Sequence, residues 1–170
     1  MAVLPIRKYG DDVLRRRTEP VTAFDGSLQK LIDDMVDTMY AAPGIGLAAN
    51  QIGSCKRLAV IDLSVGKRAG ELHVLINPEV AEVHGRLTED EGCLSIPDFT
   101  ETVVRPDRVL VTFLDRNGRP HEMWGEGLMA RAMSHEIDHL DGKLFVDRLR
   151  GFKRERILKK IQKLAKAGMW

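Results

Sequence analysis

The chain has 170 residues, of which 44% are hydrophobic and 30% are charged. These proportions are ordinary for a globular protein and exclude a disordered, collagen-like or disulfide-stapled chain. A chain of this length can bury its own core, so we expect residues 1–170 to form a single domain and a monomer. Lys and Arg number 26 and Asp and Glu number 25, which excludes a strong overall field for nucleic acid or membrane.

The two cysteines, Cys55 and Cys93, are too few for a disulfide framework. The apolar runs are shorter than the roughly 18 residues of a membrane span. Pro5 and the cations that follow it interrupt any signal-peptide core. We therefore expect a cytoplasmic protein without membrane contact.

The first expected element is an amphipathic helix. Asp25 and Ser27 are both good N-caps. Apolar residues then recur at helical spacing: Leu28, Leu31, Ile32, Met35, Val36, Met39 and Tyr40. Pro43 disfavours helical geometry in the residue before it, so this helix should end at residues 41–44.

Short β runs rich in Val, Ile and Leu follow at residues 57–63, 72–77, 80–85 and 108–115. Asn117-Gly118 predicts a hairpin turn into residues 120–124. Helices are expected at 126–140, closed by Gly142 in a left-handed cap, and at 152–166. This order predicts an α+β fold, in which antiparallel or mixed sheets pack around a central helix with an N-terminal and a C-terminal helix beside it.

The central helix carries the motif His135-Glu136-Ile137-Asp138-His139. His135 and His139 are four residues apart, so their rings lie on one helical face and can share a metal ion. Glu136 can then take a proton from water on the open side of the metal. The alternative is two helix histidines beside a solvated glutamate.

A catalytic centre of this kind usually has three protein ligands. The metzincin pattern requires a third histidine three residues after Gly142, where this chain has Phe145, and Glu155 lies among cations typical of a solvated helix. Cys93, framed by Gly92 and Pro97, is the remaining candidate, with a buried apolar role as the equal alternative. Cys55 has no such frame, and we interpret it as a core residue.

A glycine-rich segment covers residues 44–53 and is not a phosphate-binding loop, because it lacks a Lys-Ser/Thr pair and a preceding strand. Gln51 is its one neutral side-chain donor. A loop glutamine bonded to backbone is the simpler interpretation of that residue.

Three segments together resemble peptide deformylase of the bacterial type. The family pattern is Gly-x-Gly-Leu-Ala-Ala-x-Gln, then Glu-Gly-Cys-Leu-Ser, then His-Glu-x-x-His. All three occur here in that order, at residues 44–51, 91–95 and 135–139. The resemblance implies a hydrolase that removes the formyl group from the N-terminal formylmethionine of newly made polypeptides and releases formate.

The resemblance also implies roles for matching residues. Cys93, His135 and His139 would bind one divalent metal ion, with Fe(II) expected in the cell and Zn, Ni or Co as replacements. Glu136 would be the general base and then the general acid. Gln51 and the backbone N–H of Leu94 would stabilise the developing oxyanion.

The substrate would lie along backbone near Gly44, Ile45, Gly46 and Gly92 as an added strand. The methionine pocket would be lined by Leu94, Leu128, Ala132 and His135. One helical stripe carries three of these residues, Leu128, Ala132 and His135, together with His139. This spacing supports the assignment. Arg131 lies near the same face, and its effect on the pocket stays open.

Two further expectations concern charged residues. In the resembling family an arginine at the position of Arg105 braces the glutamate at the position of Glu91, so we expect these two side chains to pair. The position of Asp138 is equally consistent with two roles, as a hydrogen-bond partner of the expected metal ligands or as a residue on the helix surface. The segment from residue 148 onward is basic, which fits a solvated helix face or, as in similar bacterial deformylases, contact with the ribosome.

Two other classes of function remain open from the residues alone. An endopeptidase with the same His-Glu-x-x-His motif would cleave internal bonds and would not depend on Cys93. A non-enzymatic metal-binding or ribosome-binding protein would have a closed metal site without an open position.

Overall fold

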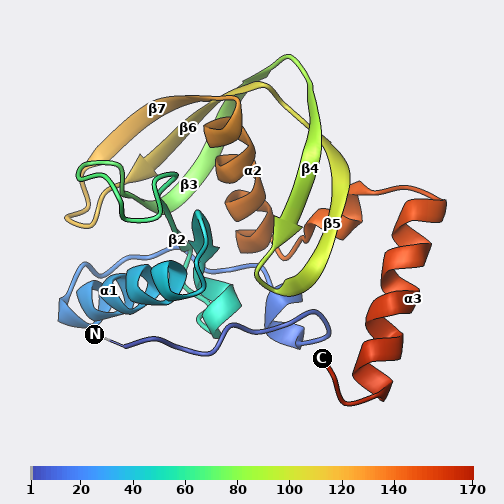
Figure 1. Cartoon of the computed structure of the whole chain (residues 1–170). Helices are drawn as coiled ribbons and strands as arrows, with labels where there is room; N and C mark the ends of the chain where they lie inside the picture. Colours follow the sequence, from blue (N-terminus) through green and yellow to red (C-terminus); the bar gives the residue numbers. More distant parts are fainter. Residues whose placement is uncertain (1) are drawn as a thin grey trace.

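The computed structural model describes residues 2–170 and confirms the α+β fold (Figure 1). Its helices are α1 (Gly26–Ala41), α2 (Leu128–Leu140) and α3 (Phe152–Lys166). One antiparallel sheet has the strand order β1-β2-β3-β6-β7. Its strands are β1 (Gly46–Ala48), β2 (Leu58–Ile61), β3 (His73–His84), β6 (Arg108–Leu114) and β7 (Pro120–Glu126). A separate antiparallel hairpin is formed by β4 (Leu87–Cys93) and β5 (Ile96–Arg105).

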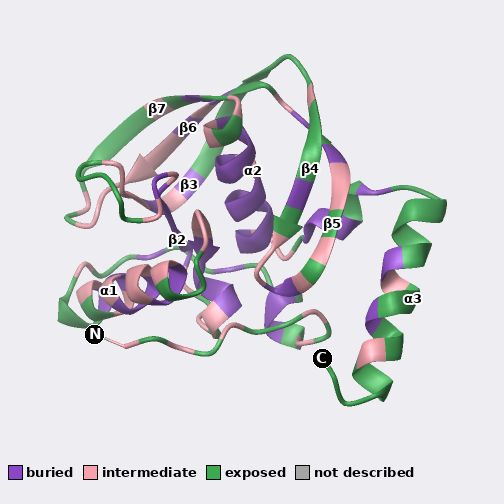
Figure 2. Cartoon of the chain, in the orientation of Figure 1, coloured by how far each residue is buried: buried purple, intermediate pink, exposed green. Residues whose placement is uncertain are grey.

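Helix α2 is the central element and lies between the five-stranded sheet and the β4–β5 hairpin (Figure 1). Figure 2 shows that it is buried along most of its length. Its apolar residues Ala130, Met133 and Ile137 share a core cluster with residues of β2, β3 and β6. The charged residues of this helix are buried as well, so they need partners inside the protein.

Helix α1 begins and ends as its sequence predicts. The Asp25 side chain accepts a hydrogen bond from the Leu28 N–H at 3.0 Å, which caps the first turn. Leu28, Ile32 and Met35 are fully buried in a second cluster against β1 and β2. The predicted apolar stripe therefore fixes this helix against the sheet edge that lies beside the central helix.

The strand predictions differ from the structure at β3 and at three strands that the expected runs leave out, β1, β4 and β5. The expected runs at 72–77 and 80–85 fall, except for their outermost residues, in the single strand β3, whose register shifts near Asn77, a residue with a φ of 51°. The β4 segment did not stand out as a β run, because residues 88–91 are Thr-Glu-Asp-Glu and lack apolar alternation. The hairpin turn at Asn117-Gly118 is confirmed, and Gly118 has a φ of 82°.

The loop after β2 is held by a buried carboxylate. Asp62 accepts a hydrogen bond from the Tyr40 hydroxyl at 2.6 Å and from the backbone N–H of Ser64 at 2.8 Å. Burial and then this hydrogen bond raise the pKa of Tyr40 to about 12. The loop that carries Val65 and Lys67 is thus anchored to α1.

Helix α3 packs on the body of the protein through one apolar side. Ile157 and Ile161 are buried in a cluster with Phe145 and Val103. Beyond the helix, the Trp170 indole N–H donates to the Tyr9 carbonyl oxygen at 2.9 Å, so the C-terminal residue is held against the segment that precedes α1.

One residue assignment is wrong. Cys55 is exposed and is not a core residue. It lies between a 3₁₀ helix (Ala49–Ile52) and β2, where its backbone carbonyl oxygen accepts a hydrogen bond from the Glu19 N–H at 2.7 Å. Within residues 2–170, none of the helices is both long enough and apolar enough to span a bilayer.

Candidate metal centre

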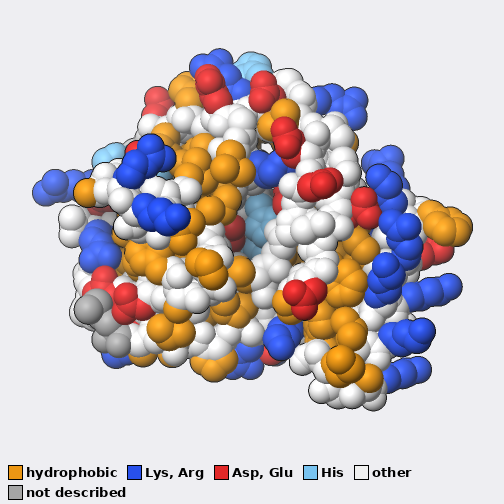
Figure 3. Space-filling view, in the orientation of Figure 1, with side chains coloured by type: hydrophobic (Ala, Val, Ile, Leu, Met, Phe, Trp, Pro, Cys, Tyr) orange, Lys and Arg blue, Asp and Glu red, His pale blue; other side chains and the backbone are white. Residues whose placement is uncertain are grey.

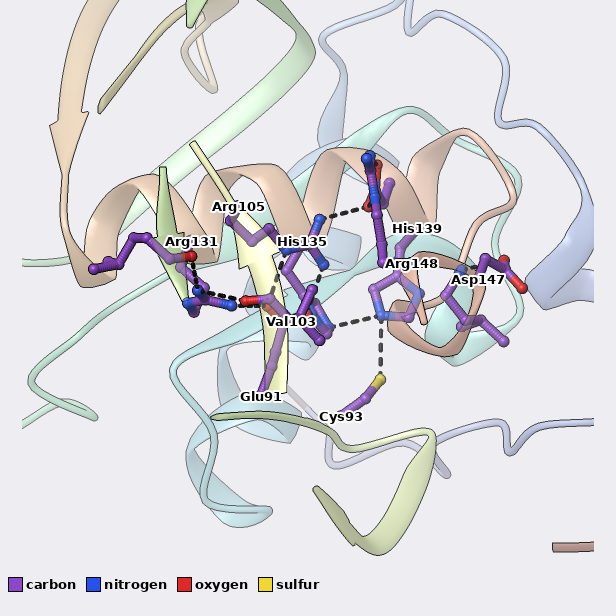
Figure 4. Close-up of polar contacts among 12 residues, drawn as sticks. Glu91, Cys93, Val103, Arg105, Arg131, His135, His139, Asp147 and Arg148 are labelled. Atoms are coloured by element: carbon purple, nitrogen blue, oxygen red, sulfur yellow. Dashed lines mark hydrogen bonds and ion pairs between the residues drawn. The ribbon is translucent and has the colours of Figure 1, made fainter. Parts of the chain in front are cut away.

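Three donor side chains from two distant segments meet at one point. Cys93 ends β4, whereas His135 and His139 lie one turn apart on α2. The His139 Nε2 atom is 3.1 Å from the His135 Nε2 atom and 3.2 Å from the Cys93 Sγ atom. The three ligand atoms all lie within 4.8 Å of one another. Figure 4 shows the two rings and the thiol turned toward each other.

The spacing and chemistry of these atoms fit a bound divalent metal ion. Metal–nitrogen bonds of about 2.0–2.1 Å and a metal–sulfur bond of about 2.3 Å in a tetrahedral site separate donor atoms by roughly 3.3–3.6 Å. The observed separations around His139 are close to these values. Thiolate and imidazole ligands suit zinc and iron alike, so the donor set does not select one metal.

Glu91 fixes the orientation of one ligand. Its Oε2 atom lies 2.6 Å from the His135 Nδ1 atom, so that nitrogen donates and Nε2 is left as the free donor for a metal. Arg105 braces the same carboxylate with two hydrogen bonds, of 2.9 and 2.6 Å, which confirms the predicted pair. Burial opposes the charge of Glu91, but the bonds from His135 and Arg105 outweigh it and hold its pKa well below the ordinary value.

The ion pairs continue beyond this predicted pair (Figure 4). Arg105 also contacts Asp138 on α2 at 2.6 Å, and Asp138 in turn accepts from Arg148 at 2.7 and 2.9 Å. Asp138 is buried and paired with two arginines, so it is not a surface residue, and it is linked to Glu91 through Arg105.

Arg131 was the residue whose role the sequence left open. It donates to Glu91 Oε1 at 2.8 Å and to the carbonyl oxygens of Leu87 and Val103 at 2.9 and 3.0 Å. The only sequence signal for this role is its position four residues before His135, on the same helical face.

Glu136 follows His135 on α2, and one of its carboxylate oxygens is not engaged in a hydrogen bond with the described residues. It is 4% exposed, and its Oε1 atom has no hydrogen-bond partner among residues 2–170. Burial raises its pKa to about 7, against the opposing charge of His135, so this carboxyl group can exchange a proton near neutral pH. Gly46 makes room for it, because a Cβ there would come within 2.5 Å of Glu136 Oε2.

The two histidines differ in their affinity for protons. Burial and the nearby charge of His135 lower the pKa of His139 well below its ordinary value, so its ring stays neutral as a ligand must. Burial also disfavours the charged form of His135, but the charge of Glu136 and hydrogen bonds to Cys93 and Glu91 raise its pKa above the ordinary value. A metal ion would therefore compete with a proton at the His135 ring, and not at His139.

Gln51 reaches the same point from the 3₁₀ helix after β1. Its Oε1 atom accepts from the Ala48 N–H at 2.9 Å, and its Nε2 atom donates to Ser95 Oγ at 3.0 Å and lies 3.8 Å from Cys93 Sγ. The interpretation as a glutamine bonded to backbone thus holds for its oxygen. Its nitrogen, however, faces the donor cluster.

A cleft of about 1010 Å³ opens over these residues. Figure 3 shows it as a hollow in the middle of this face, with histidine at its floor. Arg131 contributes to the lining of this cleft. So do all the residues expected to act on or bind the substrate: Gly44, Ile45, Gly46, Gln51, Gly92, Leu94, Leu128, Ala132, His135 and Glu136. Gly44 allows Leu94 to approach, because a Cβ at residue 44 would lie 2.8 Å from Leu94 Cδ1.

Comparisons with known proteins agree with this arrangement. A family model described as polypeptide deformylase matches residues 3–155. A peptide deformylase of Acidobacterium capsulatum is 52% identical over 170 residues, which cover 100% of both chains. One of Thermodesulfovibrio yellowstonii is 51% identical over 162 residues, which cover 95% of this chain and 98% of the relative.

Solved structures give the same result. The crystal structure of a peptide deformylase from Legionella pneumophila has a TM-score of 0.91 at 48% identity and covers 98% of each chain. That of a peptide deformylase from Synechococcus elongatus in complex with actinonin has a TM-score of 0.89 at 43% identity, covering 94% of this chain and 88% of the other.

Arg105 should control metal affinity without touching the metal. In Arg105→Met the Glu91 and Asp138 carboxylates lose their shared partner, so His135 is oriented less firmly. We expect metal affinity to fall about 10–100-fold, measured by competition with a chelator. Arg108→Met, which removes an exposed arginine paired with Glu126, is the control and should leave affinity unchanged. Equal affinity in both variants would remove Arg105 from this role.

Proposed function

The chain belongs to the polypeptide deformylase family, and from this membership we propose how its own residues carry the reaction. It is a hydrolase that removes the formyl group from the N-terminal formylmethionine of newly made polypeptides and releases formate. The observation that supports a local catalytic centre most strongly is the convergence of Cys93, His135 and His139 below the cleft. We propose these three residues as the ligands of one divalent metal ion, Fe(II) in the cell, with Zn, Ni or Co as replacements.

When bound, the metal supplies Lewis acidity, which polarises a carbonyl group and acidifies water. Glu136 is the proposed proton carrier beside it. Its unpartnered Oε1 and its pKa of about 7 suit a group that first accepts a proton from water and then returns it to the leaving amine. Its burial next to Gly46 keeps the carboxylate at one position during both transfers.

The proposed oxyanion donors are the Gln51 side-chain amide and the backbone N–H of Leu94. Gln51 is 1% exposed and is held at both ends of its amide, so it does not need to reorganise when charge develops on the formyl oxygen. A donor held in this way contributes about 2.7–4 kcal/mol in comparable sites.

The proposed substrate path follows the edge of the five-stranded sheet. Strand β1 pairs with β2 on one side only, and Ile45 and Gly46 line the cleft on the other. An extended peptide can therefore add there as a strand, with backbone near Gly44 and Gly92 beside it. Backbone pairing tolerates many sequences, which suits an enzyme that acts on many different chains.

The methionine side chain is proposed to enter the part of the cleft between the hairpin and α2. The residues that we assign to this pocket are Leu94, Leu128, Ala132 and His135. All of them line the cleft, and so does the buried Arg131. Leu128 is 53% exposed, so its apolar surface is available for such a side chain.

The direct test is hydrolysis of formyl-Met-Ala-Ser by the anaerobically purified protein, with formate as the readout. Release of formate with no cleavage of internal peptide bonds is the expected result. Cleavage of internal bonds without formate would instead indicate an endopeptidase, and no reaction by the metal-loaded protein would indicate a binding protein.

We further propose that the protein is a single-domain monomer over residues 1–170 and acts in the cytoplasm, where chains leave the ribosome. Its basic C-terminal segment is the proposed ribosome contact. Figure 3 shows Lys and Arg side chains in a row along α3. Four lysines of this helix are exposed and form no ion pair among residues 2–170: Lys159, Lys160, Lys163 and Lys166.

Cys93→Ala should abolish stable metal binding, because two imidazoles alone do not complete the site. Metal content after gel filtration measures this. Cys55→Ala, at the other and exposed cysteine, is the matched control and should retain full metal content. Full retention in Cys93→Ala would rule out the thiolate as a ligand.

Glu136→Gln should keep its metal and lose turnover by about 10²–10⁴-fold, because the amide cannot accept and return a proton. The measurements are kcat for the formylated tripeptide and metal content on the same sample. Turnover within a few-fold of the unmodified protein would remove Glu136 from the mechanism.

Reversal of three of the unpaired lysines, Lys159, Lys160 and Lys163, to Glu should weaken ribosome binding and leave cleavage of the free tripeptide unchanged. The loss should be larger at low salt, where exposed charges act over a longer distance. A control variant reverses the same number of exposed cations elsewhere, at Arg16, Arg86 and Arg119. Equal ribosome affinity in both variants across a salt series would contradict a specific role for α3.

A further inference from the structure

The Gln51 side chain is unusually well fixed for a glutamine. Its Oε1 atom accepts a hydrogen bond from the Ala48 backbone N–H at 2.9 Å. Because a backbone N–H can only donate, this contact establishes which end of the amide is oxygen and which is nitrogen. The NH₂ group must therefore point the other way, toward the β4–β5 turn.

At that end, two neighbours face the two amide hydrogens. Ser95 Oγ accepts from Nε2 at 3.0 Å, an ordinary hydrogen-bond length. Cys93 Sγ lies at 3.8 Å, a weak contact even for sulfur. One hydrogen is thus firmly held by Ser95, whereas the other is directed at the cleft beside the proposed ligands and is available to a stronger acceptor.

Ser95 is itself held from several directions. It is 0% exposed, its backbone N–H donates to Cys93 Sγ at 3.4 Å, and its carbonyl oxygen accepts from the Tyr9 N–H at 2.8 Å. The same N-terminal segment reaches Gln51, whose carbonyl oxygen accepts from the Arg7 N–H at 2.6 Å. Two residues on one extended segment, Arg7 and Tyr9, therefore set the distance between Gln51 and Ser95.

From these contacts we infer that Ser95 is a positioning residue for the reaction, whose hydroxyl oxygen holds one N–H of Gln51 so that the other points at the formyl oxygen. This inference rests on the proposed role of Gln51. A donor that is already aimed at the developing charge stabilises the transition state more than the ground state, so its orientation affects kcat more than KM.

A purely structural role for Ser95 makes a different prediction. If its hydroxyl only filled the turn beside Cys93, its loss would lower activity whether or not Gln51 were present. If it acts through Gln51, its loss should have no further effect once Gln51 has been removed. A double-mutant cycle separates the two cases.

The experiment compares the full-length, metal-loaded protein with Ser95→Ala, Gln51→Ala and the double variant, using formyl-Met-Ala-Ser. Ser95→Ala should lower kcat about tenfold, as for one net hydrogen bond in the transition state, with KM changed less than twofold. Gln51→Ala should lower kcat about 10²–10³-fold. The double variant should match Gln51→Ala alone, and metal content should be equal in all four proteins.

Thr38→Val is the matched control. It removes a buried hydroxyl that accepts from the Leu4 N–H at 2.9 Å and lies on α1 outside the cleft, so kcat should not change. A double variant slower than Gln51→Ala by the full Ser95→Ala factor would overturn this inference alone, as would metal loss in Ser95→Ala. An unchanged kcat in Gln51→Ala would overturn the role of Gln51 and the inference with it.

Discussion

The buried guanidinium of Arg105 joins the two elements that carry the proposed metal ligands. It contacts Glu91 on β4 and Asp138 on α2, each at 2.6 Å, and its own side chain is 1% exposed. Cys93 ends the same strand as Glu91, and His135 and His139 flank Asp138 on the helix. Glu91 also contacts Arg131 and His135 on the helix, at 2.8 and 2.6 Å. Arg105 adds the link to Asp138, and these pairs hold the hairpin to the helix although the hairpin is not part of the five-stranded sheet.

The same network explains how so many charges are tolerated in the interior. A buried carboxylate without partners is strongly disfavoured, and Glu91 meets this cost with three partners: Arg105, Arg131 and His135. Glu136 has no such set, and its pKa rises to about 7 because it is buried. Two carboxyl groups beside one histidine therefore differ in role, because one is held ionised as a brace and the other is left free to exchange a proton.

The sequence predicts those parts of the fold that depend on local chemistry. The Asp25 cap, Pro43 and the apolar spacing locate α1, and Asn117-Gly118 locates a hairpin. Strand β4 escapes such analysis, because its stability comes from pairing with β5 and its residues 88–91 are polar.

The site also combines features that the local sequence predicts with features that depend on contacts between distant segments. The two-histidine motif and the Glu91–Arg105 pair could be predicted, the latter only through resemblance to a family. The contact between Arg131 and Glu91 spans 40 residues and leaves no local pattern. The core placement expected for Cys55 is wrong, because free cysteines are usually buried, whereas this one lies on a connection that runs over the surface.

The most direct test of the central claim, that the hairpin and the helix close on one metal ion, is X-ray absorption spectroscopy of the zinc-loaded protein. The structure predicts one sulfur ligand at about 2.3 Å and two imidazole nitrogens at about 2.0–2.1 Å. A zinc shell of nitrogen and oxygen without sulfur would contradict the account, because the hairpin would then contribute no ligand.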